Sequence, residues 1–236
     1  MITNPTDHSQ NDLSIKTQRI KLYQRQDPRY SFFDRAYLLM VQEREKKLLQ
    51  LLARRKISLS NTKILEVGCG RGAWLRDFVR WGASPENICG VDIQPDRIAE
   101  ARELCSPGVN LICQNATQLD LPDGSFDLVF QSTVFTSVLD ENARRLLARE
   151  MIRALRSDGL IVWYDFHVNN PGNRDVRGVC REEIKQLFSN CKISLQKLTL
   201  APPIGRRAAS ISTALYRTLS KIKPLCTHYL GTITKL

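Results

Sequence analysis

Residues 63–72, which read KILEVGCGRG, decide the fold of this chain, because they join a short apolar strand to a glycine-rich turn. A helix is expected to begin near Ala73, and a second apolar stretch, residues 88–91, leads to Asp92 at the end of the next strand. Glycines let backbone N–H groups approach a ligand closely, and a carboxylate at this position can accept hydrogen bonds from a ribose diol. The stretch therefore predicts a nucleotide-binding crevice.

The rest of the chain alternates between strand-like and helix-like segments, as in a doubly wound α/β fold. The expected strands are residues 64–67, 88–92, 110–114, 126–131, 160–165, 193–200 and 229–234, and the expected helices are residues 34–55, 73–81, 95–104, 141–156 and 181–188. Gly159 is expected to be the left-handed cap of the helix at 141–156. We predict a Rossmann-like seven-stranded sheet in the order 3-2-1-4-5-7-6, with the ligand at the switch point beside the first strand.

Three parts are expected along the chain: a disordered tail (1–14), an N-terminal helical cap (15–60) and the main domain (61–236). In the cap, Asp34 is expected to begin a helix. The apolar stripe of that helix would consist of Tyr37, Val41, Leu48, Leu49 and Leu52.

An insert is expected at residues 201–228, between the last two strands. Apolar residues recur in it at helical spacing, at Ile211, Leu215, Leu219 and Ile222. The insert is also strongly basic, through Arg206, Arg207, Arg217, Lys221 and Lys223. A substrate lid, a membrane-surface element, a partner site and a helix packed on its own domain are the four readings of such a segment.

The net charge of +11 is unevenly distributed. Residues 184–236 contain nine Lys and Arg and no Asp or Glu, whereas residues 62–183 contain 18 acidic and 14 basic residues. Basic arms favour anionic small molecules, nucleic acid or anionic lipid, and the alternative is a solvated surface without a dedicated partner. An aromatic content of 7% and the lack of a recognisable RNA-binding module make nucleic acid an unfavourable choice.

Cysteine spacing and hydropathy narrow the class of protein further. The seven cysteines are scattered, without a Cys-x-x-Cys pair, so neither a disulfide framework nor a zinc site is expected. No apolar run approaches the roughly 18 residues that cross a bilayer, and the first residues lack the basic-then-apolar order of a signal peptide. We therefore expect a cytoplasmic protein without a bound metal, and the oligomeric state stays open.

The acidic residue before the glycines indicates which ligand the crevice holds. Glu66 lies two residues before Gly68, and the pattern Glu-x-Gly-x-Gly-x-Gly differs from the Gly-x-Gly-x-x-Gly of dinucleotide loops. A carboxylate is unfavourable beside a pyrophosphate and favourable beside a cation. S-adenosylmethionine carries an ammonium and a sulfonium group, so electrostatics favour it over a nicotinamide dinucleotide.

Five segments together resemble the class I S-adenosylmethionine-dependent methyltransferases, and the match covers residues 60–200. They are residues 64–72, 90–93, 115–117, 121–129 and 155–160. The region around residues 164–173, together with the insert, is similar to a bacterial small-molecule group of this family, the type 11-like methyltransferases. The resemblance implies S-adenosylmethionine as the cofactor.

It also implies a set of cofactor-binding residues. Glu66 would lie beneath the loop, the glycines would surround the methionine and ribose, Asp92 would bind the ribose hydroxyls, Ile93 and the Asn115–Ala116 pair would contact the adenine, and Gln131 would contact the amino-acid end. The full set is Glu66, Gly68, Cys69, Gly70, Arg71, Gly72, Asp92, Ile93, Asn115, Ala116 and Gln131. Asn115 departs from the family, which most often has Asp there, but an amide oxygen can still accept a hydrogen bond.

The catalytic residues are predicted at the end of the fifth strand, where residues 164–167 read YDFH. His167 is the candidate general base, with Asp165 orienting it or acting alone. The alternative is that Asp165 caps a loop and His167 is an ordinary loop residue.

The segment after the fourth strand narrows the acceptor. Residues 131–135 (QSTVF) lack the Asn/Asp-Pro-Pro-Tyr/Phe motif of amino methyltransferases that act on adenine or glutamine. We predict O-methylation of a small molecule, with an anionic or phosphate-bearing, saccharide or secondary-metabolite acceptor. An RNA methyltransferase and a non-catalytic S-adenosylmethionine-binding protein are the alternatives.

Overall fold

Seven strands form one mixed sheet in the computed structural model, which describes residues 28–170 and 172–236. Their order, β3-β2-β1-β4-β5-β7-β6, is the predicted one, and β7 runs antiparallel to both of its neighbours. The strands are β1 Ile64–Val67, β2 Ile88–Asp92, β3 Asn110–Cys113, β4 Phe126–Ser132, β5 Leu155–Phe166, β6 Cys191–Leu200 and β7 Cys226–Lys235.

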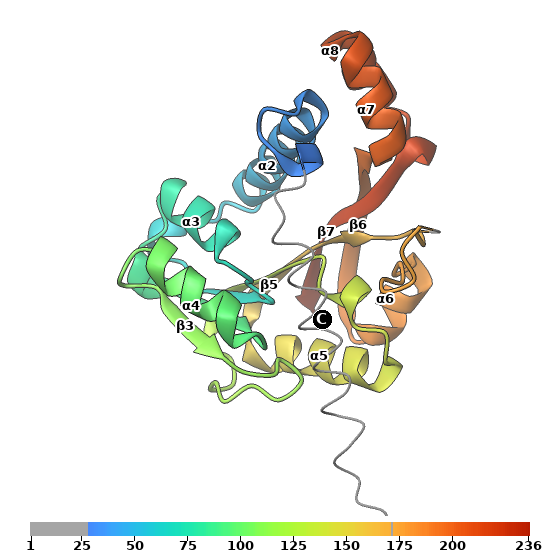
Figure 1. Ribbon diagram of the computed structural model, residues 1–236. Helices are drawn as coiled ribbons and strands as arrows, with labels where there is room; N and C mark the ends of the chain where they lie inside the picture. Colours follow the sequence, from blue (N-terminus) through green and yellow to red (C-terminus); the bar gives the residue numbers. More distant parts are fainter. Residues whose placement is uncertain (1–27, 171) are drawn as a thin grey trace, which may run out of the picture.

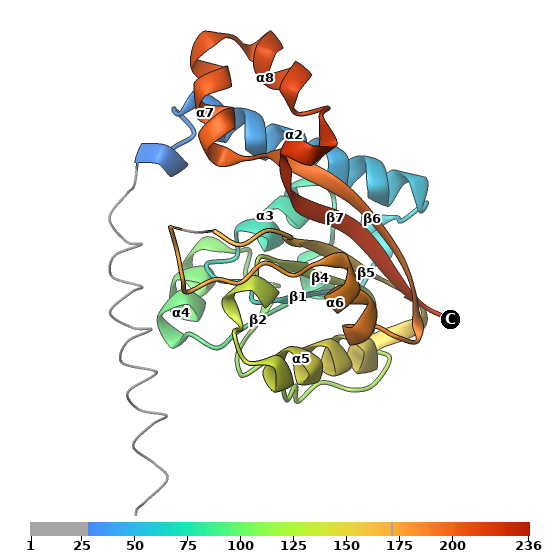
Figure 2. The same cartoon turned by 90° about the vertical axis from the view of Figure 1, so that its right-hand side faces the viewer.

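Helices cover both faces of this sheet, with α2 and α3 on one face and α5 on the other (Figures 1 and 2). Within the described residues the helices are α2 Arg35–Arg54, α3 Ala73–Arg80, α4 Pro95–Leu104, α5 Glu141–Ala154, α6 Arg181–Leu187, α7 Pro202–Ile211 and α8 Thr213–Leu219. The predicted tail at 1–14 and the first part of the predicted cap lie outside the described residues.

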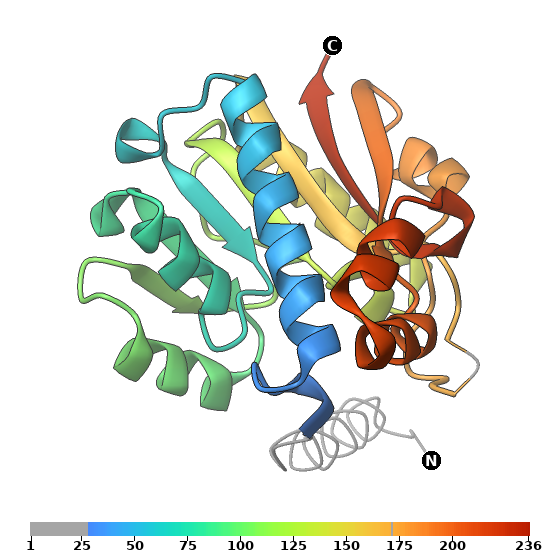
Figure 3. The same ribbon diagram turned by 90° about the horizontal axis from the view of Figure 1, so that it is seen from above.

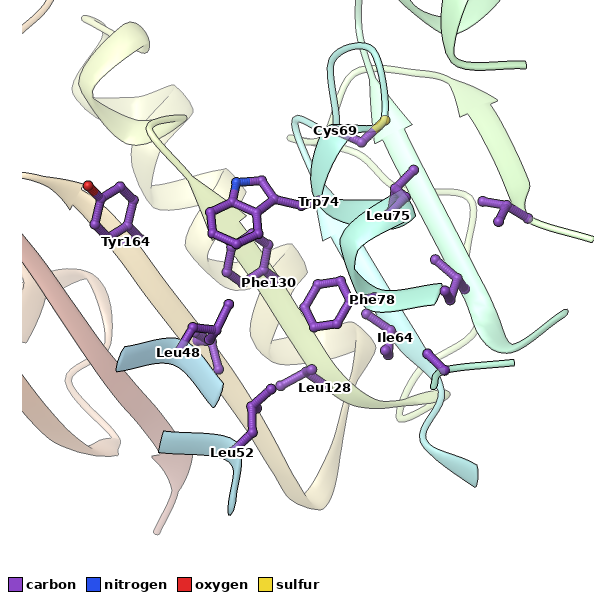
Figure 4. Packing of buried hydrophobic residues seen from close by; sticks show 14 of the residues in the cluster. Leu48, Leu52, Ile64, Cys69, Trp74, Leu75, Phe78, Leu128, Phe130 and Tyr164 are labelled. Atoms are coloured by element: carbon purple, nitrogen blue, oxygen red, sulfur yellow. The ribbon is translucent and has the colours of Figure 1, made fainter. Parts of the chain in front are cut away.

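Each face of the sheet has its own apolar core. On the α2–α3 face, Trp74 and Phe78 pack edge-to-face on Phe130 of β4 (Figure 4). On the opposite face, the tilted rings of Phe135 and Trp163 have centroids 4.6 Å apart and pack with α5 and α6 residues. Strands β1 and β2 are buried along their whole length, as expected for parallel strands covered on both sides.

Helix α2 begins and packs largely as predicted. The Asp34 side chain accepts a hydrogen bond from the Tyr37 N–H at 2.7 Å, which caps the helix. The helix then crosses the sheet (Figure 3), and Leu48 and Leu52 are almost fully buried. Burial of a leucine side chain contributes roughly 1.5–3 kcal/mol. The other predicted stripe residues, Tyr37 among them, are half-buried.

The junction between α5 and β5 contradicts the prediction. The helix ends at Ala154, and Gly159 lies inside β5 rather than in a left-handed cap. The β4–β5 pairing jumps from Leu155 to Leu160, so residues 156–159 leave the regular ladder. A Cβ atom on Gly159 would lie 2.7 Å from Leu155 Cδ1. Close packing therefore explains this glycine.

The predicted insert is a pair of helices, α7 and α8, which are separated at Ser212. Ser212 is extended (φ −161°, ψ 152°), and its side chain accepts from the Leu215 N–H at 3.0 Å, so it caps α8. Strand β7 begins at Cys226, which shortens the insert to residues 201–225. Among the described helices, none is both long and apolar enough to cross a membrane.

Candidate functional site

The glycine turn after β1 has the backbone that its sequence predicts. Gly68, Gly70 and Gly72 all have positive φ angles, of 69°, 54° and 69°. A Cβ atom would clash with Val134 at Gly68 and with the Cys105 sulfur at Gly72, whereas at Gly70 it would meet, among the described residues, only the Arg97 side chain, at 3.9 Å. Glycine is therefore needed for packing at the two outer positions, and the middle position leaves room for a ligand.

Asp92 lies at the carboxyl end of β2 and holds this turn in place. Its Oδ2 accepts from the Gly70 N–H at 2.8 Å, and its Oδ1 accepts from the Gln94 N–H at 2.9 Å. Each carboxylate oxygen keeps acceptor capacity for a further donor, such as a hydroxyl. The next residue, Ile93, is 57% exposed and offers an apolar surface beside the carboxylate.

The Asn115–Ala116 pair lies on the neighbouring strand end. The Gln114 N–H donates to the Asp92 carbonyl at 3.0 Å, which places the two strand ends side by side. Asn115 is exposed, and its Oδ1 accepts from the Thr117 N–H at 3.0 Å. The structure thus brings this pair to the same edge as Asp92, and its contact with adenine stays a prediction.

Two buried polar groups lie at the crevice without partners among the described residues. No described group donates a hydrogen bond to Glu66 Oε2, and no described group accepts one from Gln131 Nε2. Glu66 is 2% exposed and Gln131 is fully buried, and Gln131 is the register partner of Val67 at the end of β1. Unsatisfied buried polar atoms are costly. An acceptor and a donor together fit the ammonium and carboxylate of S-adenosylmethionine.

The remaining predicted residues of the loop have local roles. Cys69 is buried, and burial together with the Glu66 charge raises the pKa of its thiol, so it is not a reactive nucleophile. The Arg71 guanidinium pairs with Glu100 of α4 at 2.7 Å. The positive charge of Arg71 is therefore balanced by Glu100 of α4.

We expect S-adenosylmethionine to bind more tightly as pH rises, through Glu66. Burial, followed by the Asp92 charge, raises the pKa of Glu66, so the free protein holds the proton on this carboxyl group to a higher pH than an ordinary glutamate does. A cation favours the carboxylate, and binding must then release that proton. Glu66→Gln should remove this pH dependence and weaken binding by about tenfold.

Calorimetry in buffers of different ionisation enthalpy measures the released proton. Glu103→Gln, an exposed position on α4, is the matched control. Identical proton release by Glu66→Gln and the unmodified protein would contradict this role.

Asp165 is fully buried and anchors the segment that follows β4. Its Oδ1 accepts from Thr136 Oγ1 at 2.7 Å and from the Phe166 N–H at 2.9 Å. Burial raises the pKa of Asp165 to about 7, and the hydrogen bonds from Thr136 partly oppose that shift.

His167 contacts a different part of the sheet. Its Nε2 lies 2.9 Å from the Cys226 carbonyl, and its ring stacks on Tyr229. A carbonyl only accepts, so Nε2 carries the hydrogen and the neutral ring keeps a lone pair on Nδ1. Burial lowers the pKa of His167.

The expectation that Asp165 orients His167 is wrong. No hydrogen bond joins the two in residues 28–170 and 172–236, because Asp165 faces Thr136 while His167 is held by β7. The role of His167 as a base and that of Asp165 acting alone stay predictions.

Sequence reasoning missed a group of polar side chains where α2 and α8 cover the ends of β5, β6 and β7. We call it the cap cluster, and it consists of Glu43, Arg44, Tyr164, Thr199, Tyr216 and His228. The Tyr164 hydroxyl lies 2.8 Å from Thr199 Oγ1, and His228 stacks on the Tyr164 ring at 4.8 Å. Burial, with the Arg44 charge, lowers the pKa of His228 to about 3, so this histidine is neutral.

Arg44 connects the cap cluster to α3, the helix that follows the glycine turn. Its guanidinium lies 4.4 Å from the ring centroid of Trp74, the second residue of α3, and 5.4 Å from that of Tyr164. Figure 4 shows Trp74 and Tyr164 over neighbouring strands. Tyr164 pairs with Ser132 in register, one position beyond the Gln131–Val67 pair. The cluster therefore lies at the carboxyl edge of the sheet, level with the start of the loop.

Comparison with known proteins shows similarity to methyltransferases. Residues 64–159 match a family model described as a methyltransferase domain. The 2-methyl-6-phytyl-1,4-hydroquinone methyltransferase of Synechocystis sp. is 31% identical over 45% of this chain and 32% of its own length. The sterol 24-C-methyltransferase of Yarrowia lipolytica is 30% identical over 48% of this chain and 32% of its own length. The chain thus spans about a third of these relatives.

Solved structures share the whole fold. A Pyrococcus horikoshii protein superposes with a TM-score of 0.64, at 17% identity, over 91% of this chain and 98% of its own. An S-adenosylmethionine-dependent methyltransferase of Methanosarcina mazei gives a TM-score of 0.58, at 18% identity, over 78% and 97%. With the glycine turn, Asp92 and the sheet order in place, residues 64–159 are similar to a methyltransferase domain, and the chain shares its fold with a solved structure described as an S-adenosylmethionine-dependent methyltransferase.

Proposed function

We propose that the whole chain transfers a methyl group from S-adenosylmethionine to an oxygen of a small acceptor. The acceptor would bind between the cofactor loop and the cap cluster, where Trp74, Arg44 and Tyr164 meet. When bound, the cofactor supplies an activated methyl group on a sulfonium. The protein then needs to align the acceptor, exclude water and stabilise the developing charge.

The guanidinium of Arg44 is the observation that carries the proposal. It forms no ion pair within the described residues, and its buried Nε has no acceptor there. An unpaired cation on a half-buried side chain favours binding of an oxygen anion or a polarised hydroxyl. The flanking rings of Trp74 and Tyr164 are 8% and 2% exposed, so they make the surroundings of this cation apolar. The arrangement suits an acceptor with an oxygen at one end and an apolar body.

A hydroxyl acceptor must lose a proton during the transfer. Arg44 would stabilise the oxyanion and thereby lower the pKa of the acceptor hydroxyl. His167 is the proton acceptor that the sequence suggests, and its ring stacks on Tyr229, which packs on the opposite face of the sheet from Trp74 and Tyr164. His228 is a poor choice because its pKa of about 3 makes it a weak base.

The names of the two relatives are consistent with an acceptor of this shape. One acts on a hydroquinone that carries a phytyl chain, and the other, a 24-C-methyltransferase, acts on a carbon of a sterol. Both acceptors combine hydroxyl groups with a large apolar body. We therefore favour an amphiphilic acceptor over the phosphate-bearing sugars that the basic charge alone suggested.

A labelled-methyl assay over matched acceptors tests the proposal. The panel contains phenols, hydroquinones, sterols, sugar phosphates and an unstructured RNA, and carbon-13 NMR of the product separates O-methyl from C-methyl. We expect O-methylation of phenolic or hydroxylated apolar compounds. Transfer to RNA or sugar phosphates alone, or calorimetric cofactor binding without transfer to any acceptor, would overturn the proposal.

Arg44→Met tests the acceptor site within that assay. Methionine keeps the contact with Trp74 and Tyr164 but removes the charge, so kcat/KM should fall roughly 10- to 50-fold. Cofactor affinity should stay within about twofold, since Asp92, Glu66 and Gln131 are untouched. Arg44→Lys should recover part of the rate. Arg149→Met, an exposed position on α5, is the control, and an equal loss there would contradict the role of Arg44.

A further inference from the structure

Helices α7 and α8 form a hairpin that projects from the sheet at the end of β6 and β7 (Figure 2). One side of this hairpin packs on α2, through Ala208, Ala209 and Tyr216 against Ala36 and Leu39. A shallow surface groove of about 310 Å³ is lined by residues of both helices. The groove is lined by Pro203, Ile204, Arg207, Ala208, Ile211, Leu215 and Leu219.

The exposed surface of the hairpin is both apolar and positively charged. Ile211 is 72% exposed at the end of α7, and Ile222 beyond α8 is 44% exposed. Arg207 lines the groove itself, and Arg217 and Lys221 are exposed on and after α8. None of these three cations forms an ion pair in the described part of the chain, and residues 184–236 contain no acidic residue.

We propose that the α7–α8 hairpin docks on an anionic lipid bilayer. Ile211 and the groove enter the headgroup boundary, while Arg207, Arg217 and Lys221 contact lipid phosphates. Basic residues around an exposed apolar surface are the combination that binds an interface, because both attractions act at the same depth. The inference goes beyond the proposed function and does not depend on methyl transfer.

Charge and composition favour a bilayer over other partners. A second copy of the hairpin would bring two positive surfaces together, which is repulsive. A single-stranded nucleic acid requires exposed aromatic rings for stacking. The aromatic residue of the insert, Tyr216, is 3% exposed and faces α2. An anionic bilayer satisfies the cations and covers the isoleucines.

Vesicle flotation of the full chain tests this proposal. We expect binding to mixed phosphatidylcholine–phosphatidylglycerol vesicles, weak binding to pure phosphatidylcholine, and loss of binding at high salt. Arg207→Glu/Arg217→Glu should reduce partitioning at least about tenfold. Ile211→Asp should reduce it as well, without changing the charge of the cations.

Lys185→Glu/Lys192→Glu is the matched control, because it changes the net charge equally on exposed positions of α6 and of the far end of β6. It should retain binding. Stabilisation by S-adenosylhomocysteine, read as a thermal shift, checks that each variant is folded.

Three outcomes would overturn the proposal: equal losses in the two double variants, equal binding to neutral and anionic vesicles, or no vesicle binding by the unmodified chain. Dimerisation or RNA binding that Ile211→Asp abolishes, without vesicle binding, would assign the surface to that partner instead. Failure of methyl transfer with intact vesicle binding would affect only the proposed function.

Discussion

Asp92→Ala should lower the affinity for S-adenosylhomocysteine roughly 100-fold or more. The carboxylate is at the centre of the crevice, since it accepts from the Gly70 N–H and the Gln94 N–H and is predicted to accept from the ribose diol. Hydrogen bonds to a charged group contribute about 1.5–3 kcal/mol each. Losing two ribose contacts, together with the anchor of the glycine turn, therefore corresponds to at least two orders of magnitude.

Calorimetry with S-adenosylhomocysteine measures the loss, and Asp158→Ala provides the control. Asp158 is exposed in the irregular segment at the start of β5, away from the crevice. Asp92→Asn separates the contribution of the charge from that of the hydrogen bonds to the turn, because the amide oxygen can still accept from a backbone N–H but carries no charge. Affinity within about threefold of the unmodified protein in Asp92→Ala would contradict the assignment.

Asp165→Asn should remove a large part of the pH dependence of stability. The pKa of this buried carboxyl group is about 7 in the folded protein and about 3.9 in an unfolded chain. Between these values the folded state binds a proton that the unfolded state has lost. The stabilisation is therefore complete below about pH 4 and is lost as pH rises through about 7, and the integrated change is about 4 kcal/mol.

Denaturant unfolding at several pH values measures this effect as a difference between two proteins. Asparagine is nearly isosteric and its oxygen can accept from Thr136, so the variant should fold and its stability should change less between about pH 4 and pH 8. Asp158→Asn, an exposed position, should behave as the unmodified protein does. Parallel curves for Asp165→Asn and the unmodified protein would show that burial does not raise this pKa.

The sheet order and the cofactor edge could be predicted because their signals are local. The stretch at 63–72 contains a strand, a turn and a helix start within ten residues, and Asp92 repeats the strand-end pattern. A backbone conformation that only glycine adopts easily can be recognised in the sequence by the glycine itself. The same reasoning failed at Gly159, because close packing against Leu155 and a left-handed cap both require glycine.

The acceptor side could not be predicted in the same way, because its contacts join distant segments. Asp165 is hydrogen-bonded to Thr136, which is 29 residues away in the sequence, and Tyr164 is hydrogen-bonded to Thr199, which is 35 residues away. Nothing in the YDFH segment indicates which side chain faces which layer. Arg44 could have been noticed in the sequence, because it lies at helical spacing between Val41 and Leu48 and so interrupts the apolar stripe. A charge on the buried side of a helix is a signal worth weighing.

The length of β6 and β7 determines where the hairpin stands relative to the crevice. Each strand has ten residues, so each extends roughly 33 Å, and the two are paired along almost their whole length. Such a ribbon behaves as a rigid spacer, and a change in its length would raise or lower the hairpin and also rotate it, because alternate residues face opposite sides. The length of the ribbon therefore determines the distance between the surface that the hairpin contacts and the site of methyl transfer.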